Sequence, residues 1–182
     1  EYAETMVREA DRLNKVISDL LFMARPAPKE LEPVDLAEAA SEIERLLTFD
    51  LEEKGVELET AFQAPEARAD PGALRQALLN LVMNALTAVD EGGRIRLASR
   101  AVDGGVEVSV TDDGRGMDAE TLERAREPFY TTRADGTGLG LAIVSAVAEG
   151  VGGRLDIESE PGEGTTMRLF FPDEPENGGE AA

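Results

Sequence analysis

The fold is decided by the stretch DPGALRQALLNLVMNALTAV at residues 70–89. Its first two residues, Asp70 and Pro71, predict the start of a helix, because Asp caps a helix N-terminus and proline is tolerated in the first turn. Two consecutive glycines at 92–93 stop the helix. The stretch is rich in leucine and valine, so the polar residues within it require an explanation.

Two asparagines, Asn80 and Asn84, are four residues apart and therefore share one face of this helix. An amide that is buried without a partner costs about 1–3 kcal/mol. An amide oxygen is also a suitable hard ligand for Mg²⁺, which takes phosphate oxygens and waters as further ligands. The pair predicts either a metal and phosphate site or, more simply, two amides on a solvated helix edge.

Strand patterns and another helix surround this stretch. Residues 56–62 predict one strand, and two hairpins are expected at 95–111 and 155–171. A second helix is capped by Asp35 and ends at Gly55. Helices that interleave with antiparallel hairpins predict an α/β (α+β) sandwich, in which one layer of helices covers one mixed sheet.

Residues 1–25 predict a separate helix, because their apolar positions alternate in spacing between three and four. This seam, typical of a coiled coil or helix bundle, consists of Met6, Ala10, Leu13, Ile17, Leu20 and Ala24. The alternative is a surface helix packed on its own domain. We expect a proline-rich linker at 26–33, a catalytic domain at 34–172 and a disordered acidic tail at 173–182. Since the chain opens at Glu1 inside a helix, we expect it to be a fragment with further segments upstream.

The composition excludes several classes of function. The 182 residues carry a formal net charge of −20 and contain neither Cys nor His. Nucleic acids and anionic membranes are therefore not expected as partners, and zinc sites built on thiolates or histidines are excluded. No apolar run reaches the ~18 residues that span a bilayer. So acidic a chain must bind a polyanion through helix N-termini, backbone N–H groups or a metal ion.

Two glycine motifs supply such features. Residues 112–116, Asp-Asp-Gly-Arg-Gly, directly follow a predicted strand, so the carboxylate of Asp112 can accept from an amine such as that of adenine. The glycines there let the backbone approach a ring closely, although the motif alone is also an ordinary turn signal. Residues 136–141, Gly-Thr-Gly-Leu-Gly-Leu, precede an apolar helix at 142–148 and present N–H groups to phosphate.

A third segment, Pro-Phe-Tyr-Thr-Thr-Arg at 128–133, lies between the two glycine motifs. It combines an aromatic anchor, Phe129, with a single cation, Arg133. The segment predicts a lid whose arginine reaches a terminal phosphate, or a loop that is simply pinned by its phenylalanine.

Taken in order and spacing, these motifs closely resemble the catalytic ATP-binding domain of two-component sensor histidine kinases. Wider relatives are the gyrase, Hsp90 and MutL ATPases, which share the Bergerat fold with its mostly antiparallel sheet. The resemblance covers residues 34–172, including glycines at 152–153 and the closing segment 162–166. Residues 1–25 resemble the second helix of the dimerisation and phosphoacceptor domain of these kinases.

The resemblance implies ATP or ADP and Mg²⁺ as ligands. Asn84 would ligate the metal and Asn80 would support it, while Arg133 would contact the γ-phosphate. Asp112 would bind the adenine amine, and Thr165 would hold a water beside it. The remaining positions would shape the adenine pocket or cradle phosphates through the backbone: Gly114, Gly116, Gly136, Gly138, Leu139 and Gly140.

The resemblance further implies a homodimer formed through the helix bundle, a response-regulator receiver domain as partner, and a cytoplasmic location with any membrane anchor upstream. Thr87 departs from the family, where many members carry a basic residue, and the acceptor His is absent. The His then precedes this fragment, or the chain phosphorylates Ser on another protein, or it is a nucleotide-sensing scaffold. Asn80 stands where gyrase-like ATPases carry a Glu, which favours phosphoryl transfer over hydrolysis.

Overall fold

The computed structural model describes residues 2–24, 31–133 and 136–174. Five helices are present in these ranges: α1 (Tyr2–Met23), α2 (Leu36–Lys54), α3 (Pro71–Ala88), α4 (Ala119–Arg124) and α5 (Gly140–Glu149). The strands are β1 (Glu32–Asp35), β2 (Glu57–Phe62), β3 (Glu66–Ala69), β4 (Arg94–Val102), β5 (Gly105–Asp112), β6 (Arg154–Glu160) and β7 (Gly164–Pro172). In these ranges no helix is both long enough and apolar enough to cross a membrane.

The main sheet has five strands in the order β2-β4-β5-β7-β6. Strand β2 runs parallel to β4, because the intervening chain with α3 crosses back over the sheet. The other neighbours pair antiparallel, through the two predicted hairpins β4–β5 and β6–β7 and the central pair β5–β7. The predicted mixed, mostly antiparallel sheet is therefore confirmed.

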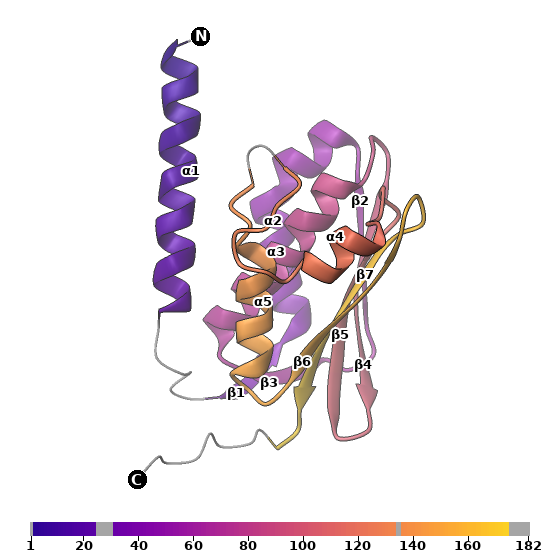
Figure 1. Cartoon of the computed structure of the whole chain (residues 1–182). Helices are drawn as coiled ribbons and strands as arrows, with labels where there is room; N and C mark the ends of the chain where they lie inside the picture. The colour runs from indigo at the N-terminus through magenta and orange to yellow at the C-terminus, as the bar shows by residue number, and fades with distance from the viewer. Residues whose placement is uncertain (1, 25–30, 134–135, 175–182) are drawn as a thin grey trace.

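Helices α2, α3 and α5 cover one face of this sheet, and α1 stands beside them (Figure 1). Alternating residues of β4 and β5 point under the helices, as their burial patterns show. The fully buried side chains that join the two layers include Leu36, Ile43, Leu78, Leu81, Ile95, Leu97, Ile143, Leu169 and Phe171. The core thus has a sheet layer and a helix layer, as the sequence pattern predicted.

Both predicted helix starts are confirmed by their caps. The Asp35 side chain accepts from the Glu38 backbone N–H at 2.9 Å, and the Asp70 side chain accepts from the Ala73 N–H at 2.8 Å. Gly55 ends α2 in the left-handed conformation, with φ 61°. These local signals fix where α2 and α3 begin, and hence which faces of the two helices reach the core.

A second, small sheet was not predicted from the sequence. Strands β1 and β3 pair antiparallel, and β1 begins at Glu32, within the segment 26–33 that we expected to be a linker. Both strands have only four residues, which is too short for a clear alternating pattern. The prolines at 26 and 28 and most of the predicted tail, 175–182, lie outside the described residues.

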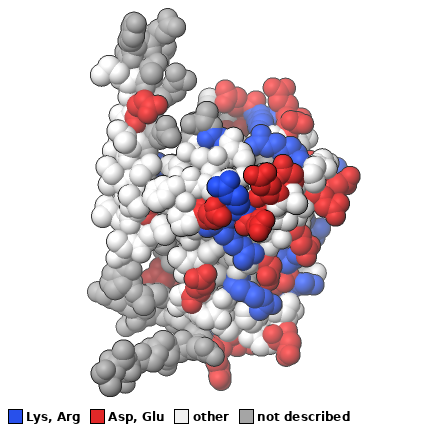
Figure 2. Space-filling view, viewed as in Figure 1, with Lys and Arg blue, Asp and Glu red and all other residues white. Residues whose placement is uncertain are grey.

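Helix α1 is confirmed, and it has two different faces. Its predicted seam is largely exposed, with Met6 at 73%, Leu13 at 61% and Ile17 at 55%, and its described part is mostly uncharged in the view of Figure 2. On another face, Asp19 is buried and Phe22 packs against the core. The helix therefore packs on its own domain and also retains an apolar face at the surface.

Candidate active site

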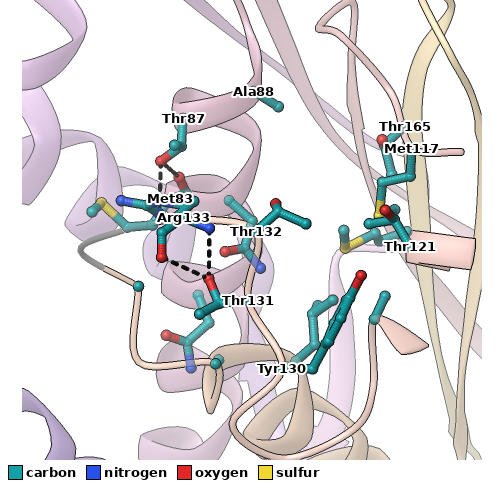
Figure 3. Close-up of a pocket in the computed structure, with 18 of the residues that line it drawn as sticks. Met83, Thr87, Ala88, Met117, Thr121, Tyr130, Thr131, Thr132, Arg133 and Thr165 are labelled. Carbon is teal, nitrogen blue, oxygen red and sulfur yellow. Dashed lines mark hydrogen bonds between the residues drawn. The ribbon is translucent and has the colours of Figure 1, made fainter.

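A cavity of about 410 Å³ opens between α3, the start of α5 and the ends of β5 and β7. The loop that carries the 128–133 segment forms its mouth (Figure 3). Nearly all of the residues predicted for the site contribute to its lining: Asn80, Asn84, Asp112, Gly116, Arg133, Gly136, Gly138, Gly140 and Thr165. Gly114 and Leu139 lie beside the cavity in the same two glycine segments.

Asn80 and Asn84 face the cavity from α3. Asn80 is only 6% exposed, and its Nδ2 has no hydrogen-bond partner among the described residues. The start of α5 lies against the pair, since a Cβ on Gly140 would be 3.8 Å from the Asn80 carboxamide and 3.9 Å from Asn84 Nδ2. The solvated-edge alternative is therefore wrong for Asn80, whose buried amide lines the cavity and carries an Nδ2 that has no partner among the described residues.

Asp112 ends β5 with its carboxylate buried at 5% exposure. Burial raises the pKa of this carboxyl, whereas hydrogen bonds from the backbone N–H groups of Gly114 and Thr165 act in the opposite direction and the charge of Asp113 adds to the rise. The bond from Gly114 to Oδ1 measures 2.9 Å. A buried, oriented carboxylate with this environment suits an amine donor better than a solvated cation.

The 112–116 loop is held tightly on both sides. A Cβ on Gly114 would lie 2.5 Å from the backbone of Ala88, which also accepts a bond from the Arg115 N–H at 3.1 Å. Gly116 has φ 64°, and a Cβ there would collide with the backbone of Glu160. Only glycine fits at both positions, so these residues set the shape of the cavity end around Asp112.

Ser159 is a residue of this end that the sequence did not reveal. Its Oγ accepts from the Met117 N–H at 2.8 Å, donates to the Gly164 carbonyl at 3.0 Å and lies 2.8 Å from Thr165 Oγ1. Thr165 in turn is the β7 partner of Asp112 in the sheet register. Ser159 therefore fixes the loop before Met117 and the Thr165 hydroxyl relative to the Asp112 carboxylate. No sequence motif marks a residue with this role.

The second glycine segment turns sharply before α5. Gly138 has φ 69°, its carbonyl accepts from the Phe129 N–H at 2.9 Å, and its Cα lies against the Phe129 backbone. Helix α5 begins with no acidic residue in its first turn and, within the described ranges, no side-chain cap. The N-terminal N–H groups of α5 can therefore interact favourably with an anion at the cavity.

The aromatic anchor predicted at Phe129 is wrong. Its side chain is 62% exposed, and the loop is instead held by the Phe129 backbone and by Leu139, which is fully buried. Gly138 lies so close to the Phe129 backbone that a Cβ on it would collide there, and Phe129 itself adopts a positive φ of 68°. Backbone contacts rather than a hydrophobic side chain pin this loop.

Arg133 reaches across the cavity mouth to α3. Its Nη1 donates to Thr87 Oγ1 at 3.1 Å, and its backbone N–H donates to Thr131 Oγ1 at 3.1 Å (Figure 3). The described cations that line the cavity are Arg133, Arg115 and Lys15 of α1. Thr87, which departs from the family pattern, therefore accepts a hydrogen bond from the guanidinium of the 128–133 segment.

Helix α1 also contacts the glycine loop directly. Thr137 Oγ1 donates to Asp19 Oδ2 at 3.3 Å and accepts from the Leu139 N–H at 3.3 Å. Burial raises the pKa of the Asp19 carboxyl, while the charge of Lys15 and the bond from Thr137 lower it. The docking face of α1 is therefore polar where it meets the loop.

Comparison with known proteins is consistent with this geometry. A family model described as histidine kinase-, DNA gyrase B-, and HSP90-like ATPase matches residues 69–175. The sensor histidine kinase ZraS of Klebsiella oxytoca is 44% identical over 152 residues, which are 82% of this chain and 33% of that protein. The chain thus spans about a third of the length of the curated relatives it matches.

Solved structures agree as well. Full-length ShkA in complex with AMPPNP has a TM-score of 0.79 at 34% identity, and the match covers 95% of this chain and 39% of ShkA. The histidine kinase ThkA, solved in complex with the response regulator protein TrrA, has a TM-score of 0.79 at 26% identity over 97% of this chain and 52% of ThkA.

Because Gly138 lies close to the Phe129 backbone, a side chain at this position should destabilise the fold more than the positive φ of Gly138 alone would. Gly138→Ala must strain a left-handed residue and also displace the Phe129 backbone, so we expect a loss of more than about 1 kcal/mol in the free energy of unfolding. Gly104→Ala is the control, because Gly104 has φ 77° but open space around it. Equal losses for the two variants in urea unfolding would contradict the close approach.

Proposed function

We propose that this chain, which belongs to the family of histidine kinase-, DNA gyrase B- and HSP90-like ATPases, is the Mg²⁺-ATP-binding catalytic domain of a sensor histidine kinase. The observation that carries the proposal is the pairing of two buried polar groups in one cavity. The Asp112 carboxylate lies at one end, and the unpartnered Asn80 amide lies beside the start of α5. An adenine and a phosphate chain satisfy both ends at once.

The adenine end is the pocket around Asp112. Its carboxylate is oriented by the N–H groups of Gly114 and Thr165, which leaves it able to accept from the exocyclic amine of adenine. Met117 and Thr165 also line the cavity, so a thioether and a hydroxyl are available to the ring on that side. Thr165, the register partner of Asp112, would hold a water next to the carboxylate.

The phosphate end combines the amides of α3 with the N–H groups at the start of α5. The donor set fits Mg²⁺, since Asn84 offers an amide oxygen and the substrate phosphates and waters supply the rest. Bound there, the metal neutralises charge on the phosphate oxygens. Asn84 would hold it, Asn80 would support the pair, and the backbone around Gly136, Gly138 and Gly140 would cradle the phosphates.

The chain's own residues favour transfer over hydrolysis. Asn80 is a poor base for activating water, because a neutral amide does not accept a proton near pH 7. Arg133 provides a planar cation at the cavity mouth, where a terminal phosphate is presented to an incoming nucleophile. Since the chain contains no His, we propose that the acceptor His lies in a part of the protein outside this sequence.

The exposed seam of α1 gives this domain a place in a larger assembly. We propose that its apolar face packs in a homodimeric helix bundle and that the phosphorylated His passes its phosphoryl group to a response-regulator receiver domain. The relative ThkA was solved with such a regulator. We further propose that these residues work in the cytoplasm, where ATP is available.

Nucleotide affinity depends on Asp112. Asp112→Asn removes a charge-assisted hydrogen bond to adenine, so ATP and ADP should both lose about 1.5–3 kcal/mol of binding free energy in titration calorimetry. Asp113→Asn is the charge-matched control, because Asp113 binds the Arg94 N–H instead of facing the cavity. Wild-type affinity in the Asp112 variant would refute the adenine assignment.

Asn84 acts through the metal. Asn84→Ala should abolish the Mg²⁺-dependent gain in ATP affinity while the affinity without Mg²⁺ and the melting temperature stay close to wild type. The exposed Asn14 supplies a control, Asn14→Ala, that should change neither quantity. An equal fall in affinity with and without Mg²⁺ would assign the amide a structural role only.

The chain should bind ATP without labelling itself. Incubation with ATP carrying a radioactive γ-phosphate should give no protein-bound label, because phosphoryl transfer needs a nucleophile positioned in line with the γ-phosphate. Adding a fragment with the acceptor His and its helix should restore some label. Strong labelling of Ser or Thr in the isolated chain would instead indicate a serine kinase, and rapid ATP hydrolysis would indicate a gyrase-like ATPase.

A further inference from the structure

We infer that Thr87 is a positioning residue that fixes the guanidinium of Arg133 at the phosphate end of the cavity and so lets the site distinguish ATP from ADP. The inference rests on the proposed nucleotide site and goes beyond it. It assigns a role to the Thr87 hydroxyl, which belongs to none of the sequence motifs and lies 46 residues away from Arg133 in sequence.

The Thr87 hydroxyl makes two bonds whose directions are complementary. It donates to the Met83 carbonyl, one turn earlier in α3, at 2.8 Å, and it accepts from Arg133 Nη1 at 3.1 Å. A hydroxyl has one donor, so its commitment to Met83 directs its lone pairs away from the helix. The α3 backbone therefore orients an acceptor toward the lid before any ligand binds (Figure 3).

Thr87 shares a helix face with the two cavity amides. Residues 80, 84 and 87 follow the i, i+4, i+7 spacing that lines up one side of an α-helix. Binding Arg133 to Thr87 consequently places a cation about one turn from Asn84. The lid and α3 thus supply neighbouring groups to the same part of the cavity.

Two bonds inside this loop act on the backbone of Arg133. The Arg133 N–H donates to Thr131 Oγ1 at 3.1 Å, and the Gly136 N–H donates to the Arg133 carbonyl at 3.3 Å. Both bonds fix the backbone of residue 133. The arginine side chain still has several rotatable bonds beyond its Cα, and ordering them costs conformational entropy. The bond to Thr87 acts on the guanidinium itself, so it meets part of this cost before the phosphate arrives.

The position of the Arg133–Thr87 hydrogen bond, here called the tie, indicates which phosphate the guanidinium would contact. Thr165, the register partner of Asp112, lies with Met117 on one side of the cavity, and Arg133, Thr87 and Thr131 lie on the other (Figure 3). An adenine on Asp112 therefore directs its phosphate chain toward the tie. A guanidinium carries five N–H donors in a planar fork, and the bond through Nη1 sets the plane of that fork for an oxyanion.

The test compares two substitutions at one position in the full chain. Thr87→Val keeps the shape of the side chain and removes the hydroxyl, whereas Thr87→Ser keeps the hydroxyl. We expect Thr87→Val to weaken ATP binding roughly five- to twentyfold in titration calorimetry, while ADP affinity changes less than about twofold. Thr87→Ser should restore most of the preference for ATP.

A matched control separates this effect from a change in helix stability. Thr48 on α2 makes the same bond to a carbonyl four residues earlier, at 2.9 Å to Glu44. Thr48→Val should leave both affinities unchanged. Arg133→Met should reproduce the loss of ATP preference, and the double variant Thr87→Val with Arg133→Met should add nothing further, because both changes break one interaction.

Two outcomes overturn the inference. ATP and ADP affinities that fall equally in Thr87→Val would make Thr87 a structural residue, and an unchanged ATP affinity would deny it any role toward the phosphate. A readout without nucleotide tests the tie alone: amide hydrogen exchange at residues 131–133 should be faster in Thr87→Val than in wild type or Thr87→Ser. If the wild-type chain binds neither nucleotide, the proposed function fails, whereas binding with an unchanged ATP preference in Thr87→Val defeats only this inference.

Discussion

The burial of α3 between the sheet and the cavity is the constraint on which the rest of the structure depends. One side of the helix is fully buried through Leu74, Leu78 and Val82, so the hydrophobic effect fixes its position on the sheet. With that side fixed, the 3.6-residue period leaves Asn80, Asn84 and Thr87 no direction except the cavity. The core thereby sets the direction of the polar groups to which we assign the chemistry.

The same helix organises the cavity at both ends. At its C-terminus the Ala88 carbonyl accepts from the Arg115 N–H, which places the 112–116 loop and hence the Asp112 pocket. Near its middle the two amides meet the first residue of α5 at Gly140. A displacement of α3 would therefore disturb the Asp112 pocket and the contact with α5 together, so the proposed adenine and phosphate ends are not independent.

Binding of a polyanion by so acidic a chain, as proposed above, depends on local donors more than on the net charge. At the proposed phosphate end these donors are the N–H groups at the start of α5, the amides of α3 and the guanidinium of Arg133. These groups act at short range in a partly desolvated cavity, where they are stronger than the screened field of distant surface carboxylates. Helix α1 adds Lys15 to this end, but it also brings the buried carboxylate of Asp19 to Thr137. The glycine loop therefore contacts the helix that carries the exposed apolar seam.

The sequence by itself determined the elements with strong local signals: the capped starts of α2 and α3, the two hairpins, the helix at 2–23, and the residues of the two glycine motifs. Those features depend on backbone geometry within a few residues, and short motifs encode such geometry. Only the tertiary structure decided that Asn80 is buried and unpartnered, that Phe129 points outward, that β1 pairs with β3, and that Ser159 and Thr87 hold site residues in place. Each of these depends on a contact between segments far apart in the chain, such as the 46 residues that separate Thr87 from Arg133, and no periodicity or motif records which distant groups the packed core brings together.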